Sequence, residues 1–252
     1  MAENVRQRLY QQALERGLRQ STVISYERLL GRIGLLDRDV ESVTQEEVFE
    51  LVWTIDNPNS RRATVIAVRA VLGFQMKIPK SIPRTYLLPS EDTLRLALMT
   101  SPHEARGLLM MYAGLRIGEA CAVTSADVAG DRLTVAKQVV QLHRKGQETV
   151  TRISPVKTSE ASIVVPTFLV GVIQSLSETA KPDSVRESLR RAGHKVGIDL
   201  NPHMLRHWYA TELLNRGVPF AQVSKQMRHS DISVTLRTYS QFNDQTIKDI
   251  WG

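Results

Sequence analysis

Apolar residues recur every three or four positions through the first 78 residues, which is the period of an amphipathic helix. Thr44 and Glu47 have the spacing of a capping box, which predicts that a helix begins there. Two other stretches keep the helical period, with apolar residues at Val23, Tyr26, Leu30 and Ile33 and again at Val65, Val68, Val71 and Leu72. This pattern predicts a small all-helical bundle over residues 1–78.

The period changes in the rest of the chain. Helical spacing continues over 91–99, with Ser90 as the N-cap, and over 105–113. Three short stretches then alternate polar and β-branched residues and predict strands, at 132–140, 149–153 and 161–165. From Thr167 onward the pattern is helical again, with boundaries near Pro182, Pro202 and Pro219. The fold class we expect is mainly α, with the helical bundle followed by an α+β domain that contains a small antiparallel three-stranded sheet.

Pro79 and Pro83 separate these two patterns and disfavour a continuous helix between them. We therefore expect a domain over 1–78, an extended interdomain linker over 79–89, and a second domain over 90–252 whose C-terminal tail begins at about residue 240.

The chain has 252 residues, with 33 Lys and Arg against 26 Asp and Glu, a formal net charge of +7. Most of the excess follows residue 78, since residues 1–78 hold 11 basic against 10 acidic residues and residues 79–252 hold 22 against 16. A basic surface favours a polyanionic partner such as nucleic acid, although a basic enzyme of small molecules stays open. With 42% apolar residues, the composition excludes a mostly disordered chain.

The single cysteine, Cys121, can form no intramolecular disulfide, which favours a reducing cytoplasm. The first 19 residues lack the apolar core of a signal peptide. The apolar-rich stretch 161–173 is shorter than the roughly 20 residues that a membrane helix needs. We therefore expect a cytoplasmic protein with no membrane partner.

Several cationic side chains stand in stretches that otherwise look packed. Arg116 lies at a glycine-flanked bend, and Glu119 follows one turn later, where a local ion pair is the simplest interpretation. His203 and Arg206 are spaced i, i+3 at the start of a helix, where backbone N–H groups attract anions. His203 and His207 have the spacing of a zinc-binding helix, but Arg206 repels a cation and the glutamate of that motif is missing.

Lys157, His229 and Tyr239 complete the candidate set, although each is ordinary by itself. Together with the two arginines they suit metal-free phosphoryl transfer. Guanidiniums can hold the nonbridging oxygens of a phosphodiester, a lysine can protonate the leaving oxygen, and a tyrosine can attack. Glu119 is the only carboxylate of the set, which disfavours a metal-dependent nuclease.

Five stretches of the sequence resemble, in order, the motifs of the tyrosine recombinase (phage integrase) family. They are Ala113–Glu119, Pro155–Thr158 before Ile163–Pro166, His203–His207, Arg228–Ser230 and Thr235–Tyr239. The resemblance covers most of residues 91–240. It implies a site-specific DNA recombinase that cleaves and rejoins strands through a 3′-phosphotyrosine and a Holliday junction, with no metal, ATP or other cofactor.

The resemblance also assigns a role to each candidate residue. It implies a phosphate clamp for Arg116 and Arg206, support of that clamp for Glu119, general acid catalysis for Lys157, assistance of proton transfer for His203, a hydrogen bond to the phosphate for His229, and nucleophilic attack for Tyr239.

The implied partners are double-stranded attachment or core sites, bound by a homo-tetramer on two DNA sites, and an accessory directionality factor or host DNA-bending protein. The setting would be the nucleoid of a bacterial or archaeal cell, where the enzyme integrates or excises phage or mobile-element DNA. By the resemblance, we expect residues 1–78 to correspond to the family's SAM-like core-binding domain and the protein to be a simple form that lacks an N-terminal arm-binding domain. The DNA contacts expected are Arg19, Arg61, Arg62, Arg69, Lys80, Arg84 and Arg228, the last of which stands where the family usually has glycine.

Apolar residues at helical spacing after Tyr239 predict that the tail docks on a neighbouring protomer, with packing in cis as the alternative. Three other functions stay open. They are a chromosome-dimer-resolving Xer-like recombinase, a type IB topoisomerase or telomere resolvase with the same chemistry, and a non-catalytic DNA-binding regulator.

Overall fold

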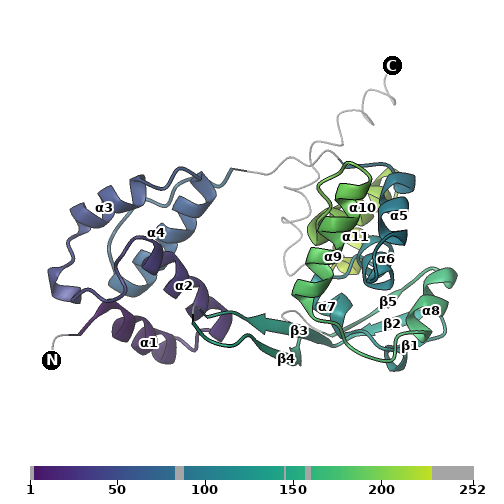
Figure 1. Cartoon of the computed structure of the whole chain (residues 1–252), viewed down its shortest axis with the longest axis horizontal. Helices are drawn as coiled ribbons and strands as arrows, with labels where there is room; N and C mark the ends of the chain where they lie inside the picture. Colours follow the sequence, from purple (N-terminus) through teal and green to yellow (C-terminus); the bar gives the residue numbers. More distant parts are fainter. Residues whose placement is uncertain (1–2, 83–87, 145, 157–159, 229–252) are drawn as a thin grey trace, which may run out of the picture. The chain divides into compact units, whose positions relative to one another are not determined.

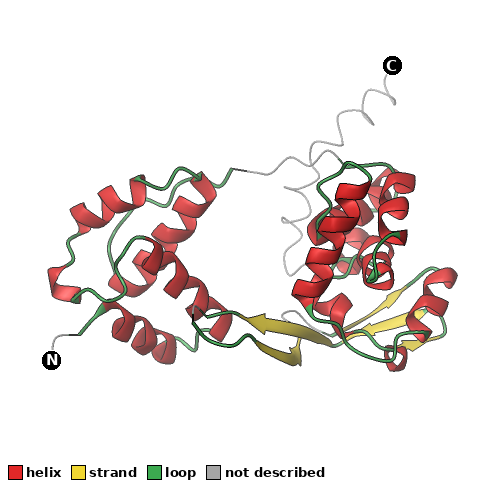
Figure 2. Cartoon of the chain, viewed as in Figure 1, coloured by secondary structure: helices red, strands yellow, loops and turns green. Residues whose placement is uncertain are grey.

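The computed structural model describes residues 3–82, 88–144, 146–156 and 160–228. The chain divides into two compact units (Figure 1): one takes in the residues up to 84 together with 142–148, and the other takes in the rest of the described chain. Helices dominate both units (Figure 2), as the hydrophobic period predicted.

The first unit is an all-helical bundle. Its helices are α1 (Val5–Glu15), α2 (Gln20–Arg32), α3 (Gln45–Trp53) and α4 (Pro58–Leu72), with a short 3-10 turn, η1 (Val40–Ser42), before α3. Leu9, Leu30 and Val48 are fully buried, because the helical period gathers them on the inner faces of the bundle. Thr44 caps α3 as expected, since its hydroxyl oxygen accepts a hydrogen bond from the backbone N–H of Glu47.

Seven helices and two small sheets make up most of the described part of the second unit. The helices are α5 (Glu91–Met99), α6 (Glu104–Tyr112), α7 (Ile117–Ala122), α8 (Thr167–Gln174), α9 (Pro182–Lys195), α10 (Pro202–Asn215) and α11 (Phe220–Gln226), with a 3-10 turn, η2 (Ser125–Asp127), after α7. Prolines occupy the first position of α9 and α10 and the N-cap of α11, which confirms the helix boundaries predicted there. Leu109, Leu133 and Leu205 are fully buried in the core of this unit.

The larger sheet is antiparallel and three-stranded, as expected, but its strands differ from those predicted. It consists of β1 (Val128–Ala129), β2 (Arg132–Val135) and β5 (Ala161–Val164), in the order β1-β2-β5. The predicted strand 132–140 breaks at Ala136, and its second part, β3 (Lys137–Leu142), pairs instead with β4 (Val150–Pro155) in a separate two-stranded sheet.

The linear pattern contains no signal for this break. Buried Leu133, Val135 and Val139 keep the alternation of a single strand across Ala136. Strand β4 is mostly exposed, so no buried face ties it to the three-stranded sheet.

Residues 142–148 join the first unit, although the sequence placed them in the domain 90–252. The Nε atom of Arg144 lies 3.3 Å from Oε2 of Glu27, and its guanidinium lies 5.8 Å from the centre of the Tyr10 ring. These contacts join residues more than 100 positions apart, so sequence patterns do not reveal them.

Candidate functional site

Three arginines and one glutamate meet in the second unit from separate stretches of chain. Arg116 is the N-cap of α7, and Glu119 lies in the first turn of that helix. Arg206 lies on α10, and Arg228 follows α11 after a single residue. The sequence predicted that Arg116, Glu119 and Arg206 act together. The structure joins the side chains of Arg116, Glu119 and Arg228 by hydrogen bonds, and Arg206 completes the cluster through the backbone carbonyls of Gly114 and Met227.

Glu119 is 2% exposed and lies between two guanidiniums. Its Oε1 accepts a hydrogen bond from Nη1 of Arg116 at 2.9 Å, and its Oε2 accepts one from Nη2 of Arg228 at 2.5 Å. The backbone N–H of Arg116 also donates to Oε2, at 2.8 Å.

Burial by itself would raise the pKa of Glu119. Arg228, together with the backbone N–H and the guanidinium of Arg116, outweighs burial and holds the pKa of Glu119 below its ordinary value. The carboxylate is therefore ionised at neutral pH, and it pairs with both arginines.

Arg206 is 6% exposed and joins the two stretches that carry the other arginines. Its Nη1 donates to the carbonyl of Gly114, and its Nη2 donates to the carbonyl of Met227 at 2.5 Å. Gly114 has a φ of +62°, and a Cβ there would lie 2.5 Å from the ring of Tyr209, so the bend before Arg116 requires glycine.

Arg228 was expected to contact DNA, but its described contacts are internal. The residue is 6% exposed, its side chain pairs with Glu119, and its carbonyl accepts a hydrogen bond from Nη2 of Arg116 at 3.3 Å. Its φ of +51° is left-handed, a conformation that costs a residue other than glycine about 1–2 kcal/mol. The glycine usual in the family would adopt this conformation without that cost.

Two histidines lie on the first turns of α10. His203 is exposed and is spaced i, i+3 from Arg206. Burial, His203 and Arg206 lower the pKa of His207 to about 4, so this ring is neutral at physiological pH.

The environment of His207 makes the stability of the protein depend on pH. Its pKa is about 4 in the folded state, against about 6.5 in an unfolded chain. The unfolded state therefore takes up the proton first, and stability present above pH 6.5 is lost as the pH falls toward 4. Between about pH 6.5 and 4.5, we expect the free energy of unfolding to fall by about 2 kcal/mol less in His207→Gln than in the parent protein, as measured by urea unfolding. An identical loss in both proteins would contradict this assignment.

Four of the residues singled out from the sequence, Arg84, Lys157, His229 and Tyr239, lie outside the described residues, as does the tail after 240. Within the described ranges, no group of three His, Cys, Asp or Glu side chains is placed to hold a metal ion. No helix of the described chain is long and apolar enough to cross a membrane.

The arginines of α4 that were expected to meet DNA bind backbone carbonyls of the first unit. Arg61 donates to Ile55 at 2.7 Å, Arg62 to Pro79 at 2.5 Å, and Arg69 to Met76 at 3.1 Å. Arg19, the N-cap of α2, and Lys80 are exposed.

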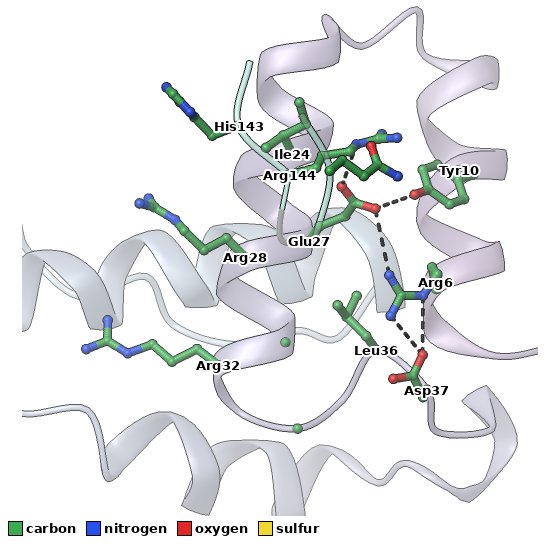
Figure 3. Close-up of a pocket in the computed structure, with 13 residues that line it drawn as sticks. Arg6, Tyr10, Ile24, Glu27, Arg28, Arg32, Leu36, Asp37, His143 and Arg144 are labelled. Carbon is green, nitrogen blue, oxygen red and sulfur yellow. Dashed lines mark hydrogen bonds and ion pairs between the residues drawn. The ribbon is translucent and has the colours of Figure 1, made fainter. Parts of the chain in front are cut away.

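Two arginines that sequence reasoning missed, Arg28 and Arg32, are exposed on α2. Both line a hollow of about 820 Å³ and a second one of about 520 Å³ in the first unit. In Figure 3 they point to the same side as His143, whereas Arg6 is paired with Glu27 and Asp37. Their i, i+4 spacing was the signal available in the sequence, because it places both on one face of a helix.

The second unit therefore combines a cluster of guanidiniums, a group suited to binding an anion such as a phosphate, with a mainly α fold. Comparisons with known proteins show which family has this fold. The sequence profile of the Phage integrase family matches residues 91–246. Since the profile covers more than half of the sequence, the chain belongs to the Phage integrase family.

Two curated relatives are similar to parts of the chain. The tyrosine recombinase XerA of Thermococcus onnurineus is 29% identical over 182 residues, which cover 63% of this chain and 58% of XerA. Transposase A from transposon Tn554 of Staphylococcus aureus is 39% identical over 69 residues, 27% of this chain and 19% of the transposase. The match thus spans less than two thirds of the length of either relative.

Two solved structures share the fold. The Tn1549 transposon integrase in complex with a circular intermediate DNA gives a TM-score of 0.69 at 18% identity, covering 94% of this chain and 95% of that one. A lambda integrase dimer bound to a COC′ core site gives a TM-score of 0.63 at 18% identity, covering 92% and 75%.

Proposed function

We propose that the chain is a site-specific DNA recombinase that cleaves and rejoins strands through a 3′-phosphotyrosine linkage. The observation that carries the proposal is the cluster of Arg116, Glu119 and Arg206 in the unit that matches the Phage integrase family. Two guanidiniums can hold the nonbridging oxygens of a phosphodiester and stabilise the charge of the transition state.

In the proposed reaction, the oxygen of Tyr239 attacks phosphorus and forms the P–O bond to tyrosine while the bond to the 5′ oxygen breaks. The phenolic proton leaves with the help of His203, Lys157 protonates the leaving 5′ oxygen, and His229 donates a hydrogen bond to the phosphate. A 5′ hydroxyl of the partner strand then reverses the step, so neither ATP nor a metal is required. The roles of Lys157, His229 and Tyr239 rest on the motifs of the sequence.

The proposed substrate is double-stranded DNA, with residues 1–78 as a core-binding domain, 79–89 as a linker and 90–252 as the catalytic domain. A homo-tetramer on two sites would exchange strands through a Holliday junction, with or without an accessory DNA-bending or directionality protein. The solved relatives bound to a circular intermediate DNA and to a core site support the choice of DNA.

An Xer-like role in resolving chromosome dimers is the second candidate, and the similarity to XerA favours it. The structural likeness to a transposon integrase and to lambda integrase favours integration and excision. The two roles differ in their substrates. Recombination between sites on separate, unlike duplexes supports integration, whereas recombination confined to two identical sites supports dimer resolution.

Incubation with a nicked duplex in EDTA tests the proposed chemistry. The DNA site is first selected from genomic fragments that the protein binds, and the nick lets the 5′-hydroxyl fragment diffuse away so that the covalent adduct accumulates. We expect an SDS-stable protein–DNA adduct. A protein that binds the selected DNA but gives no adduct would instead be a DNA-binding regulator.

Arg28 and Arg32 are the strongest candidates for phosphate contacts in the first unit, because both are exposed and no described residue pairs with them. We expect the double variant Arg28→Ala, Arg32→Ala to reduce the slope of log Kd against log salt by about 2, since each phosphate contact releases about 0.9 counterion. Arg61→Ala is the matched contrast, because its guanidinium is bound to the Ile55 carbonyl. A slope that falls for Arg61→Ala and not for the double variant would reverse the assignment.

A further inference from the structure

Arg228 is a buried cation that the proposed reaction does not use. Its side chain is 3% exposed, and its Nη2 lies 2.5 Å from Oε2 of Glu119. Its Nε has no hydrogen-bond partner among the described residues. Burying a charge is unfavourable unless the charge is paired, so the contact with Glu119 accounts for the position of this guanidinium.

The pairing changes the charge that Arg116 presents. Without Arg228, Glu119 would neutralise Arg116, and the pair would carry no net charge. With Arg228, the three side chains carry a net charge of +1. Arg116 is the member that reaches solvent, since its side chain is 33% exposed whereas Glu119 and Arg228 are each 3% exposed. The net positive charge is therefore presented through Arg116.

Arg228 also fixes the orientation of Arg116. Its left-handed backbone places its carbonyl 3.3 Å from Nη2 of Arg116, while Glu119 receives Nη1 and the backbone N–H of the same arginine. Two acceptors thus hold the Arg116 guanidinium. The first is the carbonyl of Arg228 itself, and the second is the Glu119 carboxylate, which the Arg228 side chain positions. A guanidinium fixed in this way loses little side-chain entropy when it binds a phosphate.

We propose that Arg228 is a positioning residue for the phosphoryl-transfer step, because it offsets the charge of Glu119 and orients Arg116 toward the scissile phosphate. The inference rests on the proposed recombinase function. It predicts that the loss of rate in an Arg228 variant depends on the charge of the scissile phosphate. Unfolding would not produce this dependence.

The test measures single-turnover adduct formation on two nicked duplexes, one with the ordinary scissile phosphate and one with a neutral methylphosphonate at that position. We expect Arg228→Met to slow adduct formation on the phosphate duplex by about 10- to 100-fold. This loss is smaller than the decrease in rate of about 10²- to 10³-fold that follows removal of a group donating directly to the transition state. The rate on the methylphosphonate stays near that of the parent protein, and the Kd for DNA is little changed because one contact among many is affected.

Restoring the charge provides a second variant. Combining Arg228→Met with Glu119→Gln returns the cluster to a net charge of +1, and we expect it to recover most of the rate lost in the single variant. Arg190→Met is the matched control, since Arg190 is exposed on α9 and its hydrogen bonds go to Glu187 and His194, not to the cluster. It leaves both rates unchanged.

Equal losses on the two substrates, or no recovery in the double variant, would show that Arg228 has only a structural role and would overturn the inference. An unchanged rate in Arg228→Met would overturn it as well. An absence of adduct with the parent protein on DNA that it binds would instead refute the recombinase function, and with it any positioning role.

Discussion

Tyr239→Phe abolishes the covalent protein–DNA adduct while DNA binding is retained. The substitution removes only the phenolic oxygen, which is the atom that would form the bond to phosphorus. A phenol has a pKa of about 10, so attack near neutrality depends on cationic neighbours or a base. The measurement is the yield of SDS-stable adduct on the nicked duplex, with the Kd for the same DNA determined in parallel.

Tyr112→Phe is the control for loss of a tyrosine hydroxyl in the same unit. Its hydroxyl donates to Glu91 at 2.6 Å, outside the arginine cluster, and we expect full adduct yield from this variant. An adduct that persists in Tyr239→Phe, with the DNA mapped to another residue, would refute the assignment of the nucleophile.

Arg206→Lys lowers the rate of adduct formation by about 10³-fold, the upper end of the cost of losing one donor to a transition-state oxyanion. Arg206 bridges the carbonyls of Gly114 and Met227 from one planar group. A lysine keeps the charge but offers a single ammonium, which cannot bridge both carbonyls and hold a phosphate in the same geometry. The measurement is the single-turnover rate under conditions where the variant is folded.

Arg106→Lys separates catalysis from folding. Arg106 is also buried, at 4% exposed, and donates to the carbonyls of Ala120 at 2.8 Å and Val123 at 2.6 Å. We expect its loss to lower Tm about as much as the loss of Arg206, because both arginines satisfy buried carbonyls. The rate per folded molecule should change far less. Equal losses of rate in the two variants would show that Arg206 acts only through stability.

The proposed site could be predicted from the sequence only in part. Arg116, Glu119 and Arg206 were found because their local motifs are distinctive, and the structure brings them together. The pairing of Arg228 with Glu119 was missed, because Glu119 lies 109 residues earlier in the chain. The same limit applies to Arg61, Arg62 and Arg69, whose carbonyl partners depend on how the chain turns after each helix.

By itself, the sequence determined where several helices begin, since caps, prolines and the 3.6-residue period act over a few neighbouring positions. It placed the starts of α2 and α4 a few residues late, because Arg19 and Asn57 are the N-caps there. Thr44, Ser90, Pro182 and Pro202 begin the helices that the pattern predicted. Only the tertiary structure decided the break at Ala136, the inclusion of 142–148 in the first unit, and the partner of each buried guanidinium. The physical reason is distance along the chain: a buried charge takes the acceptor that folding brings to it, and no local pattern records which acceptor that is.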